Sequence, residues 1–202
     1  MPSAREVKEA LRGFSVGIAG VGGLGSNVAM LLTRVGVGHL VIADYDTVTE
    51  DNLSRQYFFW HQVGWSKIRA LRENLLAINP MVDVRGHELK VDEDSALGVF
   101  DGVDVLVEAF DDARMKKVLI EGFQLNRPDV PIVAGSGIAG WGKSNDIRVV
   151  QYGNIYLCGD GVSEVSDHLP PLSPRVSICA SMQANVVVSI LLGRFWGGEP
   201  QP

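Results

Sequence analysis

The stretch "FSVGIAGVGGLG", residues 14–25, constrains the fold more than any other part of this 202-residue chain. Residues 14–20 form an apolar, β-branched run that predicts a buried strand. Residues 24–35 predict an apolar helix, with "GVG" (36–38) as its stop signal. A buried strand that passes through a glycine turn directly into a helix is typical of a parallel α/β sheet.

The glycines of "GVGGLG" (20–25) suit an anion-binding turn. Gly20 permits the tight turn, Gly22 lets backbone N–H groups approach a phosphate, and Gly25 lets the helix pack closely on the sheet. Gly23 lies where the N-terminus of the helix directs partial positive charge toward an anion. We therefore predict that these four glycines line a nucleotide site; a tight turn without a ligand is the alternative.

Asp44 ends the strand predicted at 39–44, about twenty residues beyond the glycine turn. In nucleotide-binding sheets, a carboxylate at this place accepts hydrogen bonds from the ribose hydroxyls. Asp46 is a nearby alternative, and a simple turn residue is its other interpretation. Up to this point NAD and ATP explain the sequence equally well, because both carry an adenosine ribose and a chain of phosphates.

Strands and helices continue to alternate along the chain. We expect further strands at 82–89, 103–110 and 130–138, and helices at 3–13, 66–79 and 114–125. After Gly140 we expect two short strands at 146–152 and 154–158, a loop at 159–175 and a closing helix at 176–192, for which the "VVV" run makes a strand the rival interpretation.

This order of elements predicts one α/β domain over residues 1–202. We expect a Rossmann-like, mostly parallel sheet with helices on both faces. The two short strands joined at Gly153–Asn154 would form an antiparallel C-terminal extension.

The composition excludes several classes of function. The formal net charge is −6, which argues against general affinity for nucleic acid or an anionic membrane. The first residues lack the apolar core of a signal peptide, and we expect a soluble, cytoplasmic protein without a membrane partner. Two cysteines without a CxxC pair predict neither a disulfide framework nor a zinc site.

The segment "DNLSRQ" (51–56) and the lysine that follows it distinguish between nucleotides. Arg55 lies after the second strand and Lys67 opens the next helix, so both can lie at the carboxyl ends of the strands, where ligands bind. A forked arginine and a lysine suit a triphosphate better than a dinucleotide. Asn52 and Gln56 can donate further hydrogen bonds; solvated positions for both cations are the alternative.

Asp111 directly follows the strand predicted at 103–110, again at a carboxyl end. A carboxylate beside phosphates is repulsive unless it holds Mg²⁺, which prefers oxygen ligands and bridges phosphates. Asp112 either assists Asp111 in holding the metal or caps the following helix. An NAD-dependent oxidoreductase remains an alternative, but it leaves Arg55, Lys67 and Asp111 unexplained.

Several of these segments together resemble the ThiF/MoeB-like family, the adenylating core shared with ubiquitin-activating enzymes. The similarity spans roughly residues 16–192, and it is closest to the short ThiF sulfur carrier protein adenylyltransferases. The matching segments, in the family's order, are "GVGGLGSN", "IADYDTVTEDNLSRQ", "GWSKIRA", "INP", "VEAFDD" and "PRVSICASMQAN".

The resemblance implies a nucleotidyltransferase that uses ATP and Mg²⁺ to adenylate the C-terminal glycine of a ubiquitin-fold carrier protein, giving an acyl adenylate and pyrophosphate. It implies that Gly22 lies against the nucleotide and that Asp44 binds the ribose. The phosphate contacts would come from Asn52, Arg55 and Gln56, charge neutralisation at the α-phosphate from Lys67, and the metal site from Asp111. The catalytic residues expected here are therefore Arg55, Lys67 and Asp111.

The client expected from the resemblance is a ThiS-like sulfur carrier with a Gly-Gly C-terminus, in thiamine biosynthesis. A molybdopterin-type or other ubiquitin-like carrier is the alternative client, and a member that only binds nucleotide or partner is a further one. Relatives pair, so we expect a homodimer, and the aromatic segment "YFFWHQVGW" (57–65) is either part of its interface or ordinary packing.

The sequence departs from the family at three places. Many relatives carry two CxxC pairs that hold zinc, and some carry a cysteine in the loop corresponding to 159–175; neither occurs here. We interpret Cys179 as a packing residue and favour a structural role for Cys158. Relatives also carry an arginine in the leading helix that reaches the partner subunit's ATP, for which Arg5 and Arg12 are the candidates.

Overall fold

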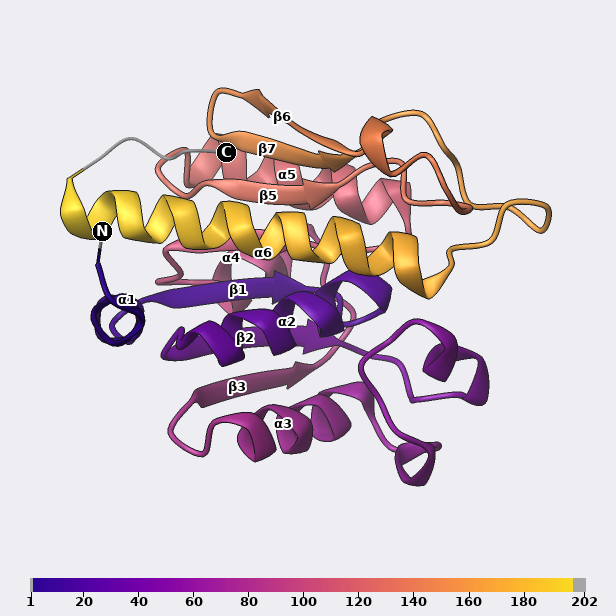
Figure 1. The fold of residues 1–202 in the computed structure, drawn as a ribbon, viewed down its shortest axis with the longest axis horizontal. Coiled ribbons are helices and arrows are strands. Elements are labelled where there is room, and N and C mark those ends of the chain that lie inside the picture. The colour runs from indigo at the N-terminus through magenta and orange to yellow at the C-terminus, as the bar shows by residue number, and fades with distance from the viewer. Residues whose placement is uncertain (1, 198–202) are drawn as a thin grey trace.

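A computed structural model describes residues 2–197 and places seven strands in one sheet, in the order β3-β2-β1-β4-β5-β7-β6 (Figure 1). The strands are β1 Ser15–Ala19, β2 His39–Asp44, β3 Asp83–Glu88, β4 Val105–Glu108, β5 Ile132–Gly135, β6 Arg148–Tyr152 and β7 Ile155–Gly159. The α-helices are α1 Ala4–Leu11, α2 Gly23–Val35, α3 Lys67–Ile78, α4 Glu93–Val99, α5 Ala113–Asn126 and α6 Ser173–Trp196.

The sheet is parallel except at one edge. The β1, β2, β3, β4, β5 and β7 strands pair in parallel, whereas β6 runs antiparallel to β7, with Val150 opposite Leu157. The hairpin turns at Gly153, whose φ of +60° suits a residue without a side chain. The Rossmann-like fold class predicted from the sequence, including its antiparallel C-terminal extension, is therefore confirmed.

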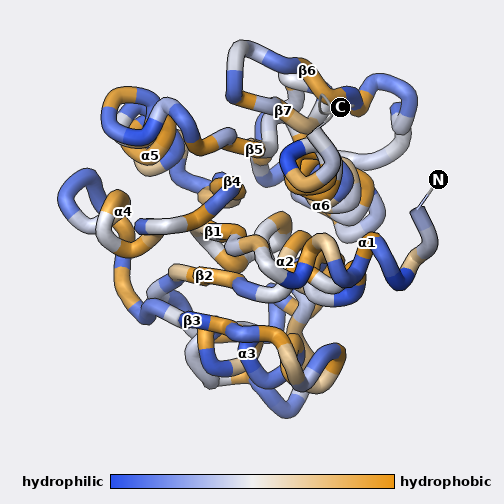
Figure 2. The backbone as a smooth tube through the Cα atoms, turned by 90° about the vertical axis from the view of Figure 1, so that its left-hand side faces the viewer, coloured by the Kyte–Doolittle hydropathy of each residue, from blue (hydrophilic) through white to orange (hydrophobic). Residues whose placement is uncertain are grey.

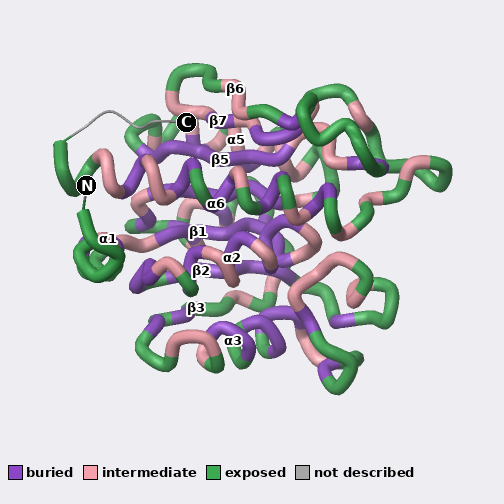
Figure 3. Tube along the Cα trace, in the orientation of Figure 1, coloured by how far each residue is buried: buried purple, intermediate pink, exposed green. Residues whose placement is uncertain are grey.

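Helices cover both faces of the sheet (Figure 2). On one face α1, α2, α3 and α6 pack over a core that includes Leu32, Leu71 and Val187, all of them inaccessible to solvent. On the other face α4 and α5 enclose a smaller core around Phe100 and Phe123. The central strands are buried on both sides, which explains their almost continuous apolar sequence (Figure 3).

The closing segment is a helix, and the rival interpretation of a strand is wrong. It extends from Ser173 to Trp196, beyond the predicted 176–192, because Pro174 occupies the first turn and Gly197 supplies the left-handed cap with φ +72°. By length and composition α6 could cross a membrane, but half of its most apolar window is buried inside the protein. That burial is typical of a core helix.

The other observed elements differ from the sequence prediction mainly in their bounds and in several short helices. The leading helix starts at Ala4 rather than Ser3, because the Ser3 side chain accepts a hydrogen bond from the Glu6 N–H and caps the helix. The short helix α4 was not expected from the sequence. Residues 50–62 contain two short 3₁₀ helices, Glu50–Ser54 and Trp60–Gln62, at the carboxyl edge of the sheet.

Candidate nucleotide site

The glycine turn joins β1 to α2 as the sequence predicts. Gly20 has a φ of +86°, and its N–H donates to the Ala43 carbonyl of β2. Gly22 is the N-cap of α2, with no side chain over the first N–H groups of the helix. A Cβ at Gly25 would lie 1.9 Å from the Gly20 carbonyl oxygen, so the close packing of α2 against the turn requires glycine.

Asp44 at the end of β2 is bound to the turn itself. Its two carboxylate oxygens accept hydrogen bonds from the Val21 N–H at 2.8 Å and the Asp46 N–H at 2.9 Å. The residue is 9% exposed. Because a carboxylate offers about four acceptor positions, the two backbone bonds leave Asp44 able to accept from a ribose.

Arg55 and Gln56 lie against the glycine turn. The nearest atom to a Cβ built at Gly22 is Gln56 Nε2, at 3.8 Å, and the Arg55 side chain lies at 3.8 Å from one built at Gly23. Residue Asn27 of α2 donates to the Arg55 carbonyl at 2.9 Å, which fixes this loop to the helix. The structure thus brings together residues that are about thirty positions apart in the sequence.

The polar tips of these two side chains make few contacts with the rest of the described chain. Among the described residues, the Arg55 guanidinium donates to neighbours in its own loop, the Asp51 carbonyl and Ser54 Oγ. The Gln56 Oε1 atom is buried and has no hydrogen-bond partner among residues 2–197. Asn52 uses its side-chain oxygen locally, as an acceptor from the Thr49 N–H at 3.2 Å.

Lys67 is a nearly buried cation at the start of α3. It is 5% exposed, and its Nζ lies 2.7 Å from Asp46 Oδ2. Asp46 in turn donates its N–H to Asp44, so one chain of contacts connects Lys67 to the candidate ribose carboxylate. Asp46 therefore does more than fill a turn: it links Lys67 to the candidate nucleotide site, a role not predicted from the sequence.

Asp111 lies in the loop between β4 and α5 and is exposed. The segment before it packs on the glycine turn, because a Cβ at Gly20 would lie 2.9 Å from the Ala109 carbonyl oxygen. The Asp112 side chain accepts from the N–H groups of Arg114 and Met115. Asp112 is thus the N-cap of α5, and a nucleotide contact from it stays a prediction.

The donor set fits a magnesium ion that arrives with a nucleotide. Within the described part of the chain, no group of three or more His, Cys, Asp or Glu side chains could hold a metal by itself. Mg²⁺ in phosphate sites is commonly bound through one or two carboxylates and the substrate's own oxygens. One exposed carboxylate at Asp111 meets that requirement.

The sequence prediction omitted a buried ion pair behind Asp111. Glu108 ends β4 with no exposed surface, and its Oε2 lies 2.6 Å from Lys116 Nζ of α5. Burial raises the pKa of the Glu108 carboxyl above its usual value, and the Lys116 ammonium and the Phe110 N–H oppose that increase. A glutamate inside the apolar run "DVLVEAF" is the signal that could have identified the pair.

A second buried ion pair closes the loop between β7 and α6. Arg175, 4% exposed, donates to Asp160 through Nη2 and to the Gly142 carbonyl at 2.7 Å through Nη1. Asp160 also accepts from the N–H groups of Val162 and Ser163. The two ends of the loop are therefore tied together, while Val162 and Val165 within it are exposed.

Both cysteines are buried in the core. Cys179 of α6 donates its thiol to the Cys158 carbonyl at 3.1 Å, and neither residue has exposed surface. Burial raises the pKa of both thiols to about 12. A thiol with that pKa is a weak nucleophile at neutral pH, which agrees with the packing role proposed from the sequence.

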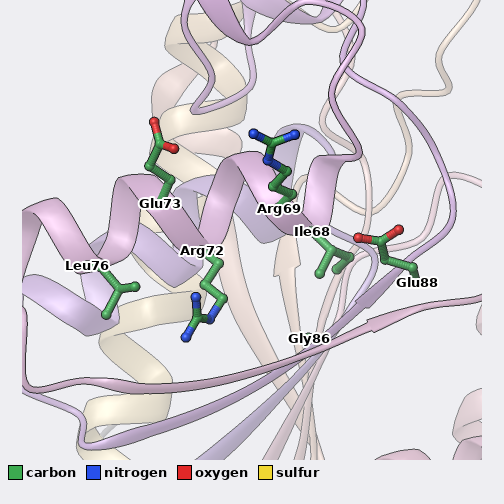
Figure 4. A pocket seen from close by; sticks show the side chains of 7 residues that line it. All are labelled: Ile68, Arg69, Arg72, Glu73, Leu76, Gly86 and Glu88. Carbon is green, nitrogen blue, oxygen red and sulfur yellow. The ribbon is translucent and has the colours of Figure 1, made fainter.

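An open groove of about 590 Å³ lies elsewhere, between α3 and the edge strand β3. Arg72 points toward the strands, whereas Arg69 and Glu73 point away from them (Figure 4). Arg69 instead stacks on the ring of Trp65, with Cζ 4.0 Å from the ring centroid. The groove contains none of the predicted site residues, so it is not the candidate nucleotide site. Its lining residues are Ile68, Arg69, Arg72, Glu73, Leu76, Gly86 and Glu88.

The candidate arginine of the leading helix has an ordinary surface position. Arg5 Nε lies 2.9 Å from Glu9 Oε1, one turn later on α1, and both side chains are exposed. A contact of Arg5 or Arg12 with a second subunit's nucleotide stays a prediction.

The fold and this site define a Rossmann-like domain whose glycine turn is bordered by an arginine and a glutamine and is linked through two aspartates to a buried lysine. The model of the ThiF family matches residues 3–202, and the chain belongs to the ThiF family.

Two groups of curated relatives are similar to the chain. It is 33% identical over 197 residues to adenylyltransferase and sulfurtransferase MOCS3 of Culex quinquefasciatus, a match that covers 91% of this chain and 43% of the relative. It is 39% identical over 94 residues to ubiquitin-like modifier-activating enzyme 5 of Caenorhabditis briggsae, covering 46% and 22%. The chain thus spans less than half the length of these relatives.

Solved structures agree with the fold. The ATP complex of the Escherichia coli tRNA N6-threonylcarbamoyladenosine dehydratase TcdA superposes with a TM-score of 0.85 at 19% identity, covering 94% of this chain and 90% of that one. The ATP complex of E. coli MccB gives a TM-score of 0.70 at 25% identity, covering 96% and 59%.

Proposed function

We propose that this chain is a sulfur carrier protein adenylyltransferase. It binds ATP at the glycine turn and transfers AMP to the C-terminal glycine carboxylate of a small ubiquitin-fold carrier, with release of pyrophosphate. The observation that carries this proposal is the approach of Arg55 and Gln56 to Gly22 and Gly23, beside the buried Lys67 and the ribose-type carboxylate of Asp44.

The chemistry requires little beyond positioning and charge stabilisation. A carboxylate oxygen of the carrier attacks the α-phosphorus, a new oxygen–phosphorus bond forms, and the bond from the α-phosphorus to the bridging oxygen breaks as pyrophosphate leaves. The substrate is already an anion, so no general base is needed. Arg55 and Lys67 stabilise the negative charge that develops on the phosphate oxygens.

Asp111 is proposed to hold Mg²⁺ against the phosphates. When bound, this ion neutralises phosphate charge and makes pyrophosphate a better leaving group. Asp44 accepts from the ribose hydroxyls, and the N-terminus of α2 faces the phosphates with its free N–H groups. Asn52 and Gln56 supply further hydrogen bonds.

The proposed client is a ThiS-like carrier with a Gly-Gly C-terminus, in thiamine biosynthesis, and the proposed compartment is the cytoplasm. Support for a ubiquitin-fold partner comes from the relatives, which include a ubiquitin-like modifier-activating enzyme and an adenylyltransferase and sulfurtransferase. A molybdopterin-type carrier is the alternative client for the same chemistry. Because both thiols are buried, we assign no sulfur-transfer step to this chain.

Carrier-dependent exchange of labelled pyrophosphate into ATP tests the reaction and the client together. The purified chain is incubated with ATP, Mg²⁺ and each of several Gly-Gly-ended carriers, including ThiS-type and molybdopterin-type proteins. Exchange with the ThiS-type carrier, and its loss when the terminal glycine is removed, is the expected result. If the chain binds ATP but none of the carriers supports exchange, the proposal is contradicted.

A further inference from the structure

We infer that Glu108 and Lys116 are positioning residues for the magnesium ligand Asp111. They lie three residues before it and five residues after it. This inference rests on the proposed function, since it assigns two further residues to the same site. The juxtaposition that carries it is a fully buried carboxylate and a lysine, linked across the base of the loop that presents Asp111.

The Glu108 side chain binds the backbone of the loop that leads to Asp111. Its Oε1 accepts the Phe110 N–H at 2.8 Å, so the carboxylate binds the backbone of the loop that it opens. The adjacent Ala109 N–H donates to the Ala19 carbonyl of β1 at 2.9 Å. The chain therefore leaves β4 with the backbone of Ala109 and Phe110 held in place, directly before Asp111.

Lys116 fixes the opposite side of the loop. From α5 its Nζ reaches Glu108 Oε2 and the Gly135 carbonyl of β5, each at 2.6 Å. Asp112 caps the same helix through the Arg114 N–H at 2.7 Å, which places Asp111 between the helix cap and the strand end. One ammonium group thus joins β4, β5 and α5 around this residue.

The surroundings show that the pair is not simply a surface contact. Gln183 of α6 directs its Nε2 at the carbonyls of Glu108 (3.5 Å) and Val133 (3.4 Å), while its Oε1 is buried without a hydrogen-bond partner in the described residues. Removing one member of a buried ion pair leaves the other uncompensated, so the remaining group must move or change its protonation state. Loss of Lys116 would therefore change the position or the protonation state of the Glu108 side chain that holds the Phe110 N–H, and with it the position of Asp111.

A purely structural role for the pair makes a different prediction. It would lower the melting temperature of a variant and leave metal binding in the folded protein unchanged. A positioning role changes the Mg²⁺ concentration at which ATP binds tightly. The two can be separated by a binding measurement that does not depend on turnover.

The experiment is isothermal titration calorimetry of ATP binding to the full chain over a series of Mg²⁺ concentrations. We expect Lys116→Met to raise the Mg²⁺ concentration for half-maximal ATP affinity by roughly tenfold, as for other residues that orient a metal ligand. Asp111→Asn should shift it in the same direction. Lys116→Arg should restore most of the wild-type value, because it keeps a cation beside the buried Glu108 carboxylate.

Lys117→Met is the matched control, since Lys117 is the next residue of α5, is exposed and pairs only loosely with Glu121 at 3.8 Å. An unchanged Mg²⁺ dependence in folded Lys116→Met would overturn the inference. If that variant does not fold, Glu108→Gln decides, because it keeps the shape of the side chain and removes the charge. Normal Mg²⁺ dependence in this variant, too, would overturn the inference.

Failure of the proposed function gives a different result. A wild-type chain that binds ATP with Mg²⁺ but exchanges no pyrophosphate with any carrier would reject the carrier reaction and leave the binding test intact. If the wild-type chain exchanges normally and the Lys116 and Glu108 variants keep the wild-type Mg²⁺ dependence of ATP binding, only the positioning role is rejected.

Discussion

At the scale of residues, two cations of different burial are linked to the glycine turn, Arg55 directly and Lys67 through Asp46 and Asp44. Lys67 is nearly buried and already paired with Asp46, whereas the Arg55 guanidinium donates hydrogen bonds to the Asp51 carbonyl and Ser54 Oγ of its own loop. A cation that is shielded from water acts on a phosphate more strongly than an exposed one, because the local dielectric constant is lower. The two residues should therefore differ in what they contribute.

Lys67→Ala is expected to abolish carrier-dependent pyrophosphate exchange, and Arg55→Ala to lower it by about a hundredfold or more. Removal of Lys67 also leaves the Asp46 carboxylate without its partner. The measurement is the exchange rate at saturating ATP, with circular dichroism to show that each variant is folded. Arg34→Ala is the control, since Arg34 lies in the last turn of α2, at the end away from the glycine turn. Full exchange activity in both the Lys67→Ala and Arg55→Ala variants would contradict the roles assigned to these residues.

Cys179→Ser should keep adenylation activity. The thiol has a pKa of about 12 because it is buried, so it is protonated throughout the neutral range, and a serine hydroxyl can donate to the same Cys158 carbonyl. Alkylation with iodoacetamide at pH 8, followed by mass spectrometry, should modify neither cysteine until the protein is unfolded. Rapid labelling of the native chain would mean that the thiols are accessible.

Among single residues, the sequence was informative where a motif fixes the position and uninformative where contacts cross the fold. The positions of Gly20, Gly25 and Asp44 follow from the strand–turn–helix pattern. The contact between Asp46 and Lys67 links residues 21 positions apart in sequence, and no spacing rule predicts it. The roles of the predicted site residues toward a nucleotide remain predictions.

At the scale of elements, the packing of α2 on the glycine turn is the tightest contact near the site. Gly25→Ala would place a Cβ 1.9 Å from the Gly20 carbonyl oxygen, so α2 must move away from β1. We expect a loss of about 3 kcal/mol or more in the free energy of unfolding, with loss of ATP binding. Urea unfolding and calorimetry would measure these two effects.

Gly122→Ala is the matched variant in a helix without such a contact. A Cβ at this position of α5 meets no atom within 4 Å, so the substitution should stabilise the protein by roughly 0.5–1 kcal/mol through helix propensity. Equal effects of the two substitutions would show that the turn is not closely packed.

Element boundaries show what the sequence can and cannot specify. Strand β2 matches its predicted bounds of 39–44, because a polar aspartate ends an apolar run. Helix α4 was missed because its seven residues carry little apolar periodicity, and the Asp92 cap is the main local signal for it. Helix α6 exceeds its prediction because its polar first turn and aromatic last turn fall outside the apolar run.

At the scale of the whole molecule, stability should depend on pH through Glu108. Burial raises its pKa in the folded state above 4.5, so over a window that begins near pH 4.5 the folded chain binds more protons than the unfolded chain. This residue therefore contributes a loss of stability as pH rises through that window. The free energy of unfolding of Glu108→Gln, relative to wild type, should increase from pH 4.5 toward pH 7. A constant or decreasing difference would contradict the raised pKa.

A homodimer is expected in solution, as proposed from the resemblance to the family. Phe59 and Trp60 of the aromatic segment are 46% and 69% exposed in the single chain, which supports an interface there. Light scattering coupled to size-exclusion chromatography should give twice the 21.9 kDa mass of one chain. Trp60→Ala should shift this mass toward the monomer, whereas Leu125→Ala, an exposed position on α5, should leave it unchanged.

The buried ion pair between Arg175 and Asp160 joins the two ends of the segment between them, so that this segment forms a closed loop. Protease cleavage inside it should therefore yield two fragments that stay associated and retain the sheet. The same closure makes this segment replaceable: a loop of different length, grafted between the two residues, should leave the sheet and its helices undisturbed.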